Sequence, residues 1–180
     1  MPENRSIKAA LALIDQDPTK ILGLTVGPHT NVKPGQYIPK ADAQSHPTLS
    51  FDVASPSATY MVVSLDIDAP FPSFGVLGPI LHWIQPGIKA SNGQLEVTKP
   101  FVANYIGPAP PPGSSPHRYI FFLYEQPEGF DGKKYAPPNG QNLSNWYRMR
   151  YDLDAWEKEI GLEEILCIVS VVNGCLAYVA

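Results

Sequence analysis

This chain of 180 residues contains few cysteines and only a small excess of charge of one sign. Two cysteines cannot build a disulfide framework, and no Cys-x-x-Cys spacing indicates a zinc site. The formal net charge of −4 argues against nucleic acid, or an anionic membrane surface, as an obligatory partner. These shortages predict a protein without a metal centre or a nucleic-acid partner, and with at most peripheral membrane contact.

Long apolar segments are also missing. Residues 1–20 carry charges throughout and show no apolar centre of a secretory signal. The longest apolar run, residues 165–180, is broken by Ser170 and by Asn173-Gly174, and it is too short and too β-branched for a membrane-spanning helix. The sequence therefore predicts a cytoplasmic protein, and its length favours a single domain over residues 1–180.

Proline is abundant: 20 prolines spread along the chain predict many short elements joined by stiff turns, as in all-β folds. We expect strands over residues 21–26, 48–53, 59–65, 80–84, 94–98 (an edge strand), 117–124, 165–172 and 175–179. Pro86-Gly87 predicts a break, and Asn173-Gly174 predicts a two-residue hairpin turn between the last two strands. Apolar spacing predicts an amphipathic helix within residues 1–14, and Asp152 is a credible N-cap for a helix through Ile160.

Polar side chains follow or begin three of these strands: Asp66 and Asp68, His82, and His117. Residues i and i+2 of an extended segment share a face, so the two aspartates are expected to point into one pocket. Each feature alone is ordinary, because a lone histidine at a strand end is more often a surface or core residue. Tyr119 shares a face with His117 and fits core packing or a pocket wall equally well.

Arg118 lies on the opposite face of the same strand, beside Ile120 and Phe122. This position predicts a buried cation, which needs a carboxylate partner and serves the scaffold rather than a ligand. Trp83 and the apolar residues of 59–65 are expected in the core.

The combination resembles the phosphatidylethanolamine-binding protein family. The resemblance is carried by Asp66-Ile67-Asp68-Ala69-Pro70, then His82-Trp83, then Gly113 followed by Pro116-His117-Arg118-Tyr119. It extends over roughly residues 20–172 and implies a β-sandwich of two antiparallel sheets with a few short peripheral helices. It also implies a small anion pocket formed by Asp66, Asp68, Pro70, His82, Ala109, Pro110, His117 and Tyr119.

Three departures from the family pattern affect this pocket. Ile67 stands where the family usually has proline, which predicts a less rigid turn between the aspartates. Ala109 replaces a glycine and adds a methyl group that narrows the site. The sequence stops at Ala180 without the C-terminal helix that covers the pocket in animal members, so we expect an open site in which head groups bind more securely than lipid tails.

The resemblance also implies a non-catalytic role: binding phosphate-like anions or phospholipid head groups, with no cofactor, and inhibiting or regulating partner proteins. The N-terminal helix is similar to that of a fungal branch associated with inhibition of serine carboxypeptidases. A kinase-signalling regulator is the alternative, and the helix can also simply cover the sandwich. A hydrolase is a weaker hypothesis, because Ser114 and Ser115 lack a nucleophile-elbow pattern and Cys167 lies in an apolar strand.

Overall fold

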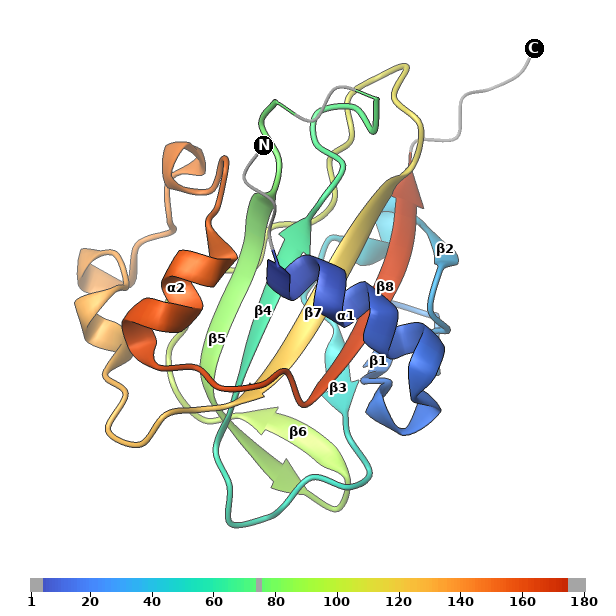
Figure 1. Ribbon diagram of the computed structural model, residues 1–180. Coiled ribbons are helices and arrows are strands. Elements are labelled where there is room, and N and C mark those ends of the chain that lie inside the picture. Colours follow the sequence, from blue (N-terminus) through green and yellow to red (C-terminus); the bar gives the residue numbers. More distant parts are fainter. Residues whose placement is uncertain (1–4, 74–75, 175–180) are drawn as a thin grey trace.

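The computed structural model describes residues 5–73 and 76–174 and is mainly β with few helices, as predicted (Figure 1). The strands are β1 (Gly23–Thr25), β2 (Gln36–Pro39), β3 (Thr48–Ser50), β4 (Tyr60–Asp66), β5 (Ile80–Ser91), β6 (Gln94–Val97), β7 (His117–Glu125) and β8 (Cys167–Gly174). The α-helices are α1 (Arg5–Gln16) and α2 (Leu153–Ile160). Five short 3-10 helices are η1 (Pro18–Lys20), η2 (Lys40–Ala43), η3 (Gly132–Lys134), η4 (Pro138–Gly140) and η5 (Asn145–Tyr147).

The strands form one hydrogen-bonded series in the order β1-β3-β6-β5-β4-β7-β8-β2. Neighbouring strands are antiparallel except for β2 and β8, which run parallel. A parallel bridge between Ile21 and Ile168 brings the chain just before β1 onto β8, so the series nearly closes on itself. The division into two separate sheets stays an expectation.

The core lies on both faces of the central strands. Every residue of β4 is buried between β5 and β7, as the continuous apolar pattern predicts. One face packs against side chains of β1, β2 and β3 and contains Trp83, in agreement with its predicted core position. The other face packs against Ala10 of α1 and against Leu153 and Trp156 of α2. Burying each large apolar side chain contributes about 1.5–3 kcal/mol to the stability of this arrangement.

Both predicted helices are present. Asp152 caps α2 by accepting a hydrogen bond from the Ala155 N–H at 2.9 Å, and Gly161 ends the helix in a left-handed conformation. Helix α1 lies across β8, and its first N–H groups, those of Arg5 and Ser6, donate to the Asp154 carboxylate of α2 (Figure 1). In the part of the chain that the structure describes, no helix is both long and apolar enough to cross a membrane.

Two predictions for β5 and β6 were wrong. Strand β5 continues through Pro86-Gly87, because these residues form an irregularity opposite β4 where a residue without an N–H and a glycine at φ 66° are tolerated. Strand β6 is not an edge strand, since it pairs with both β3 and β5. The hairpin turn that joins β5 to β6 is Asn92-Gly93, where both residues have positive φ.

The hairpin predicted at Asn173-Gly174 was also wrong. Strand β8 continues through both residues, and Asn173 pairs with His117 of β7 on one side and with Ile38 of β2 on the other. Pairing on both sides holds this Asn-Gly dipeptide extended, so its turn propensity is overridden. The predicted second strand, residues 175–179, lies outside the described residues.

Candidate functional site

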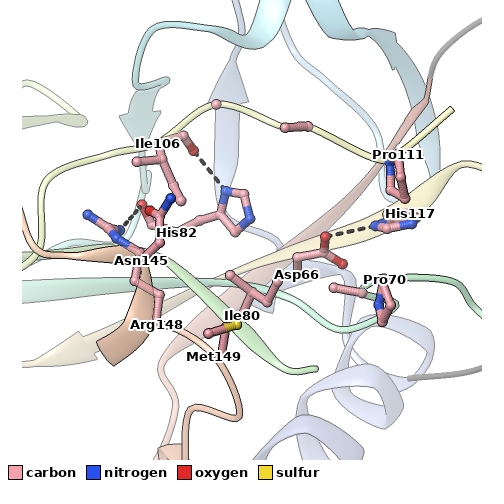
Figure 2. A pocket seen from close by; sticks show the side chains of 13 residues that line it. Asp66, Pro70, Ile80, His82, Ile106, Pro111, His117, Asn145, Arg148 and Met149 are labelled. Atoms are coloured by element: carbon pink, nitrogen blue, oxygen red, sulfur yellow. Dashed lines mark hydrogen bonds and ion pairs between the residues drawn. The ribbon is translucent and has the colours of Figure 1, made fainter. Parts of the chain in front are cut away.

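A pocket of about 360 Å³ lies where β4 ends and where β5 and β7 begin (Figure 2). The loop before β7 and the segment around η5 complete its wall. The lining residues are Asp66, Ala69, Pro70, Ile80, His82, Ile106, Gly107, Ala109, Pro111, His117, Asn145, Arg148 and Met149. The structure therefore brings together residues from three strands, from the turn after β4 and from two further segments that are far apart in the sequence.

His117 is held at both ring nitrogens. Its Nδ1 lies 2.8 Å from Asp66 Oδ2, and its Nε2 lies 2.8 Å from Ser114 Oγ. The Ser114 hydroxyl donates to the Ser115 carbonyl at 2.8 Å and so accepts from the imidazole. The Asp66 carboxylate can only accept, and its Oδ1 also accepts from the Asp68 N–H at 2.9 Å. Both ring nitrogens of His117 therefore donate, which is the hydrogen-bonding pattern of an imidazolium.

Electrostatics agrees with this assignment. Burial alone lowers the pKa of His117, but the hydrogen bond and the negative charge of Asp66 outweigh it and raise that pKa above its ordinary value. The geometry and the direction of this pKa shift both favour the protonated form of His117 beside the Asp66 carboxylate.

His82 has the opposite character. Its Nδ1–H donates to the Ile106 carbonyl at 2.8 Å, and burial lowers its pKa despite that hydrogen bond and the nearby Asp66. His82 is therefore neutral at neutral pH, and its Nε2 carries a lone pair. Within the described residues no partner occupies that nitrogen, so the pocket receives a hydrogen-bond acceptor from this side.

Asp68 does not share the pocket with Asp66, which corrects the face-sharing prediction. Its carboxylate accepts from the backbone N–H of Arg118 and from the Arg118 Nε and Nη2 groups, at 2.8, 2.8 and 2.7 Å. Burial tends to raise the pKa of Asp68, but these bonds and the guanidinium charge lower it overall. The predicted pairing of Arg118 with an acid is present, but the predicted burial of the cation is wrong: the Arg118 side chain is 50% exposed, and the acid is the buried partner.

The buried cation of this region is Arg148, which the sequence analysis missed. Arg148 is 1% exposed, and burial lowers its pKa to about 10, so it stays charged at neutral pH. Its guanidinium donates only to neutral oxygens: the carbonyls of Leu143, Leu81, His82 and Asn104, and the Asn104 side-chain amide. Among the side chains that the structure describes, no carboxylate forms an ion pair with it. No local pattern marks this arginine, because it lies in irregular chain and is placed by distant partners.

The other predicted site residues are distributed as follows. Pro70 and Ala109 line the pocket, whereas Pro110 is buried and the neighbouring Pro111 lines it instead. Tyr119 lies behind the pocket, buried, with its ring edge-on to His82 at 5.0 Å between centroids, and it lines a small separate cavity. Burial also raises the pKa of its phenol. Whether any of these residues contacts a ligand stays a prediction.

The chain Ser114–His117–Asp66 has the connectivity of a nucleophilic triad. The proton positions differ from what that chemistry needs, because a general base must be free to accept the serine proton and His117 already carries two. In the same described part of the chain, no group of three or more His, Cys, Asp or Glu residues could hold a metal ion. The arrangement is suited to holding a ligand by charge and shape.

Comparison with known proteins relates the chain to one family. The family described as "Phosphatidylethanolamine-binding protein" matches residues 28–157. The Saccharomyces cerevisiae protein named "Carboxypeptidase Y inhibitor" is 26% identical over 176 residues, covering 81% of this chain and 80% of that protein. The Talaromyces stipitatus protein named "Phomoidride biosynthesis cluster protein N" is 35% identical over 113 residues, covering 58% of this chain and 54% of that protein.

Solved structures agree on the fold. A crystal structure of carboxypeptidase Y inhibitor complexed with the cognate proteinase superposes with a TM-score of 0.72 and 26% identity, covering 93% of this chain and 92% of that chain. A phosphatidylethanolamine-binding protein from Plasmodium vivax superposes with a TM-score of 0.66 and 17% identity, covering 96% and 97% of the two chains. The second likeness bears on the fold alone.

Proposed function

The chain belongs to the phosphatidylethanolamine-binding protein family, and from this premise we propose that it is a non-catalytic protein that binds a small anion and inhibits a serine carboxypeptidase. The observation that supports an inhibitor is the similarity to carboxypeptidase Y inhibitor, which extends over most of both chains in sequence and in fold. A regulator of kinase signalling is the alternative partner class within the same family.

The anion part of the proposal rests on Arg148. A guanidinium buried without a described carboxylate partner creates a positive potential that an anion entering the pocket can neutralise. The positive charge of His117 is already balanced by Asp66, so Arg148 supplies the excess. The phosphate-like anion or phospholipid head group implied by the family resemblance is one ligand of suitable sign.

Inhibition of carboxypeptidase Y tests the partner. The intact chain is expected to inhibit at micromolar concentration, about 10 µM or below, measured on hydrolysis of a blocked dipeptide. If the intact chain does not inhibit at that concentration, the inhibitor proposal is wrong. A pull-down from source cells that retrieves kinases instead would support the alternative partner class.

Deleting residues 1–14 tests whether α1 contributes to inhibition or only covers the sheet. Ala10 packs in the core and Ser6 bonds to α2, so thermal unfolding of the truncated chain must be measured alongside. Ala12→Glu is the matched surface variant, because Ala12 is exposed on the same helix. If Ala12→Glu loses inhibition while its thermal unfolding is unchanged, α1 contacts the carboxypeptidase.

A hydrolase is the second candidate, and only the Ser114–His117–Asp66 connectivity favours it. Because His117 is doubly protonated, we propose no turnover. Hydrolysis of carboxyl and phosphate esters should equal the rate without protein, and Ser114→Ala should not change it. A saturable activity that disappears in Ser114→Ala or His117→Ala contradicts the non-catalytic proposal.

The proposal includes a single domain over residues 1–180 arranged as a two-sheet sandwich, located in the cytoplasm. A single cooperative unfolding transition, the same by fluorescence and by circular dichroism, tests the domain. A fluorescent fusion expressed in source cells tests the location.

A further inference from the structure

We infer that the pocket binds a small monocarboxylic acid with an apolar body, in preference to inorganic phosphate or a bare head group. This inference rests on the proposed anion pocket and names its ligand class. It is carried by three properties of the described residues: the pocket wall, the number of free hydrogen-bonding groups, and the net charge.

The wall is mostly apolar and the volume is too large for a bare anion. Seven lining side chains are apolar: Ala69, Pro70, Ile80, Ile106, Ala109, Pro111 and Met149. The volume of about 360 Å³ falls in the range of pockets that enclose organic ligands, roughly 300–1,000 Å³. A phosphate ion has no apolar surface to place against this wall, whereas a branched or cyclic hydrocarbon does.

The free hydrogen-bonding groups are few. Arg148 has five N–H donors and all five are used by carbonyl and amide oxygens of the protein. His117 uses both of its N–H groups on Ser114 and Asp66. The side chains left for a ligand are the Asn145 amide, which has no hydrogen bond to any described residue, and Nε2 of His82. Two such side chains match the two oxygens of a carboxyl.

The charge of the pocket also matches a monoanion. Arg148 and His117 are positive and Asp66 is negative, which leaves one unbalanced positive charge. Asp68 and Arg118 neutralise each other away from the pocket. A carboxyl that shares one proton with His82 leaves this single positive charge unchanged, whereas a dianionic phosphate would bring a second negative charge close to Asp66.

The neutral Nε2 of His82 can accept the proton of the ligand carboxyl. A carboxylic acid can enter with its O–H donating to the neutral Nε2, or its proton can pass to that nitrogen to form an imidazolium–carboxylate pair. Either form contains one proton shared by one nitrogen and one oxygen, and no covalent bond changes. Arg148 lies on the His82 side of the pocket, and Pro70, Pro111 and His117 lie on the other side (Figure 2). The carboxyl therefore belongs near His82, and the apolar body extends along the wall.

Calorimetric titration of the full chain at pH 6 tests this inference with four probes: cyclohexanecarboxylate, acetate, inorganic phosphate and phosphoethanolamine. Each buried CH₂ group tightens binding about fourfold, so cyclohexanecarboxylate should bind at least about thirtyfold more tightly than acetate. It should also bind more tightly than either phosphate compound.

Three variants distinguish the contribution of the apolar wall from that of the polar groups beside the carboxyl. Met149→Gln keeps the side-chain length and makes the wall polar. It should therefore weaken the binding of cyclohexanecarboxylate about tenfold and leave the affinity for acetate unchanged. Asn145→Asp places a negative charge beside the carboxyl and should abolish binding of both. Asn142→Asp is the matched control, because this exposed residue lies three positions earlier and does not line the pocket; binding should be unchanged.

The outcomes are distinguishable. Phosphate binding more tightly than cyclohexanecarboxylate, with loss in Asn145→Asp, leaves the anion pocket standing and overturns the carboxylic acid. Cyclohexanecarboxylate binding that does not respond to Met149→Gln also overturns the inference. Absence of binding for all four probes contradicts the proposed anion pocket itself.

Discussion

At the scale of single residues, Arg148 connects several segments of the pocket wall through its guanidinium. Its guanidinium satisfies carbonyl groups from three segments, including those of Leu81 and Asn104. Arg148→Met keeps similar bulk but leaves these buried acceptors unpaired, so the free energy of unfolding should fall by roughly 3 kcal/mol. Urea unfolding measures this loss. Arg150→Met, the same substitution at an exposed position, should change stability by no more than about 0.5 kcal/mol. Equal midpoints for the two variants would contradict this role for Arg148.

The two pocket histidines should titrate on opposite sides of the ordinary histidine pKa, about 6.5. Asp66 raises the pKa of His117, and burial lowers that of His82. The contribution of His117 to stability is therefore fully present below pH of about 6.5 and is lost as the pH rises through its raised pKa. His82 acts oppositely and costs stability once the pH falls below about 6.5, because only the unfolded chain then takes up the proton.

Ring resonances followed by NMR measure both pKa values. In Asp66→Asn the pKa of His117 should fall, because burial is then opposed only by the charge of Asp68 and by the Pro70 backbone. Asp42→Asn, at an ion pair with His29 away from the pocket, is the control and should leave His117 unchanged. A His117 that titrates below His82 in the unmodified chain would show that the proton assignment is wrong.

At the scale of elements, the bonds of Asp68 to Arg118 tie the turn after β4 to the start of β7. Asp68→Asn should reduce the free energy of unfolding by about 1–2 kcal/mol at pH 7, a figure that allows for solvent screening of the half-exposed guanidinium. Because the pKa of Asp68 is lowered in the folded state, this stability is present above pH of about 3.9 and is lost as the pH falls through the folded pKa.

Chemical unfolding at pH 7 and in acid checks this tie. The difference in free energy of unfolding between the unmodified chain and Asp68→Asn should become smaller below pH of about 4. The exposed variant Asp52→Asn should show no such difference at either pH. A gap that is equally large in acid would mean that the ion pair is not its source.

A helix or strand could be predicted from the sequence where its own residues determine it. Strand β4 and helix α2 are determined by their own apolar patterns and caps, so sequence predicted both. Asn92-Gly93 and Asn173-Gly174 carry the same turn signal, yet only the first is a turn, because the second is paired on both sides by distant strands. A local pattern contains no information about that pairing.

The site shows the same division. The residues flanking Asp66 and His117 predicted that both lie at strand ends, and the structure joins them. The prediction that Asp68 shares a face with Asp66 was wrong because β4 ends at Asp66. The Asp66 carboxylate accepts a hydrogen bond from the Asp68 N–H, and the chain turns there. Arg148 could not be predicted, since its partners lie up to 67 positions away in sequence.

At the scale of the whole molecule, the charge distribution is uneven. The chain carries a net charge of −4, yet residues 69–79, 100–116 and 135–147, which supply much of the pocket wall, contain no Asp, Glu, Lys or Arg. The positive charge of Arg148 is therefore not cancelled by nearby surface acids on these segments. A protein that repels anions at long range can still bind one at this end.

Anion affinity should consequently depend on pH through the pocket histidines. A bound anion stabilises protonated His82 and raises its lowered pKa, so binding takes up protons and tightens as the pH falls from about 8 to about 6. Loss of the His117 proton above its raised pKa weakens binding further in the same direction. Full uptake of one proton corresponds to about tenfold in affinity per pH unit.

A carboxylate ligand makes this dependence measurable, because simple carboxyls titrate near pH of about 4 and stay ionised over the range. Calorimetry in buffers of different ionisation enthalpy reports the protons taken up directly. His82→Gln should flatten the part of the slope below neutral pH, whereas His46→Gln, at a histidine that does not line the pocket, should preserve it. Affinity that stays constant from pH 8 to 6, or that persists in a variant with both His82→Ala and His117→Ala, would place the anion elsewhere on the molecule.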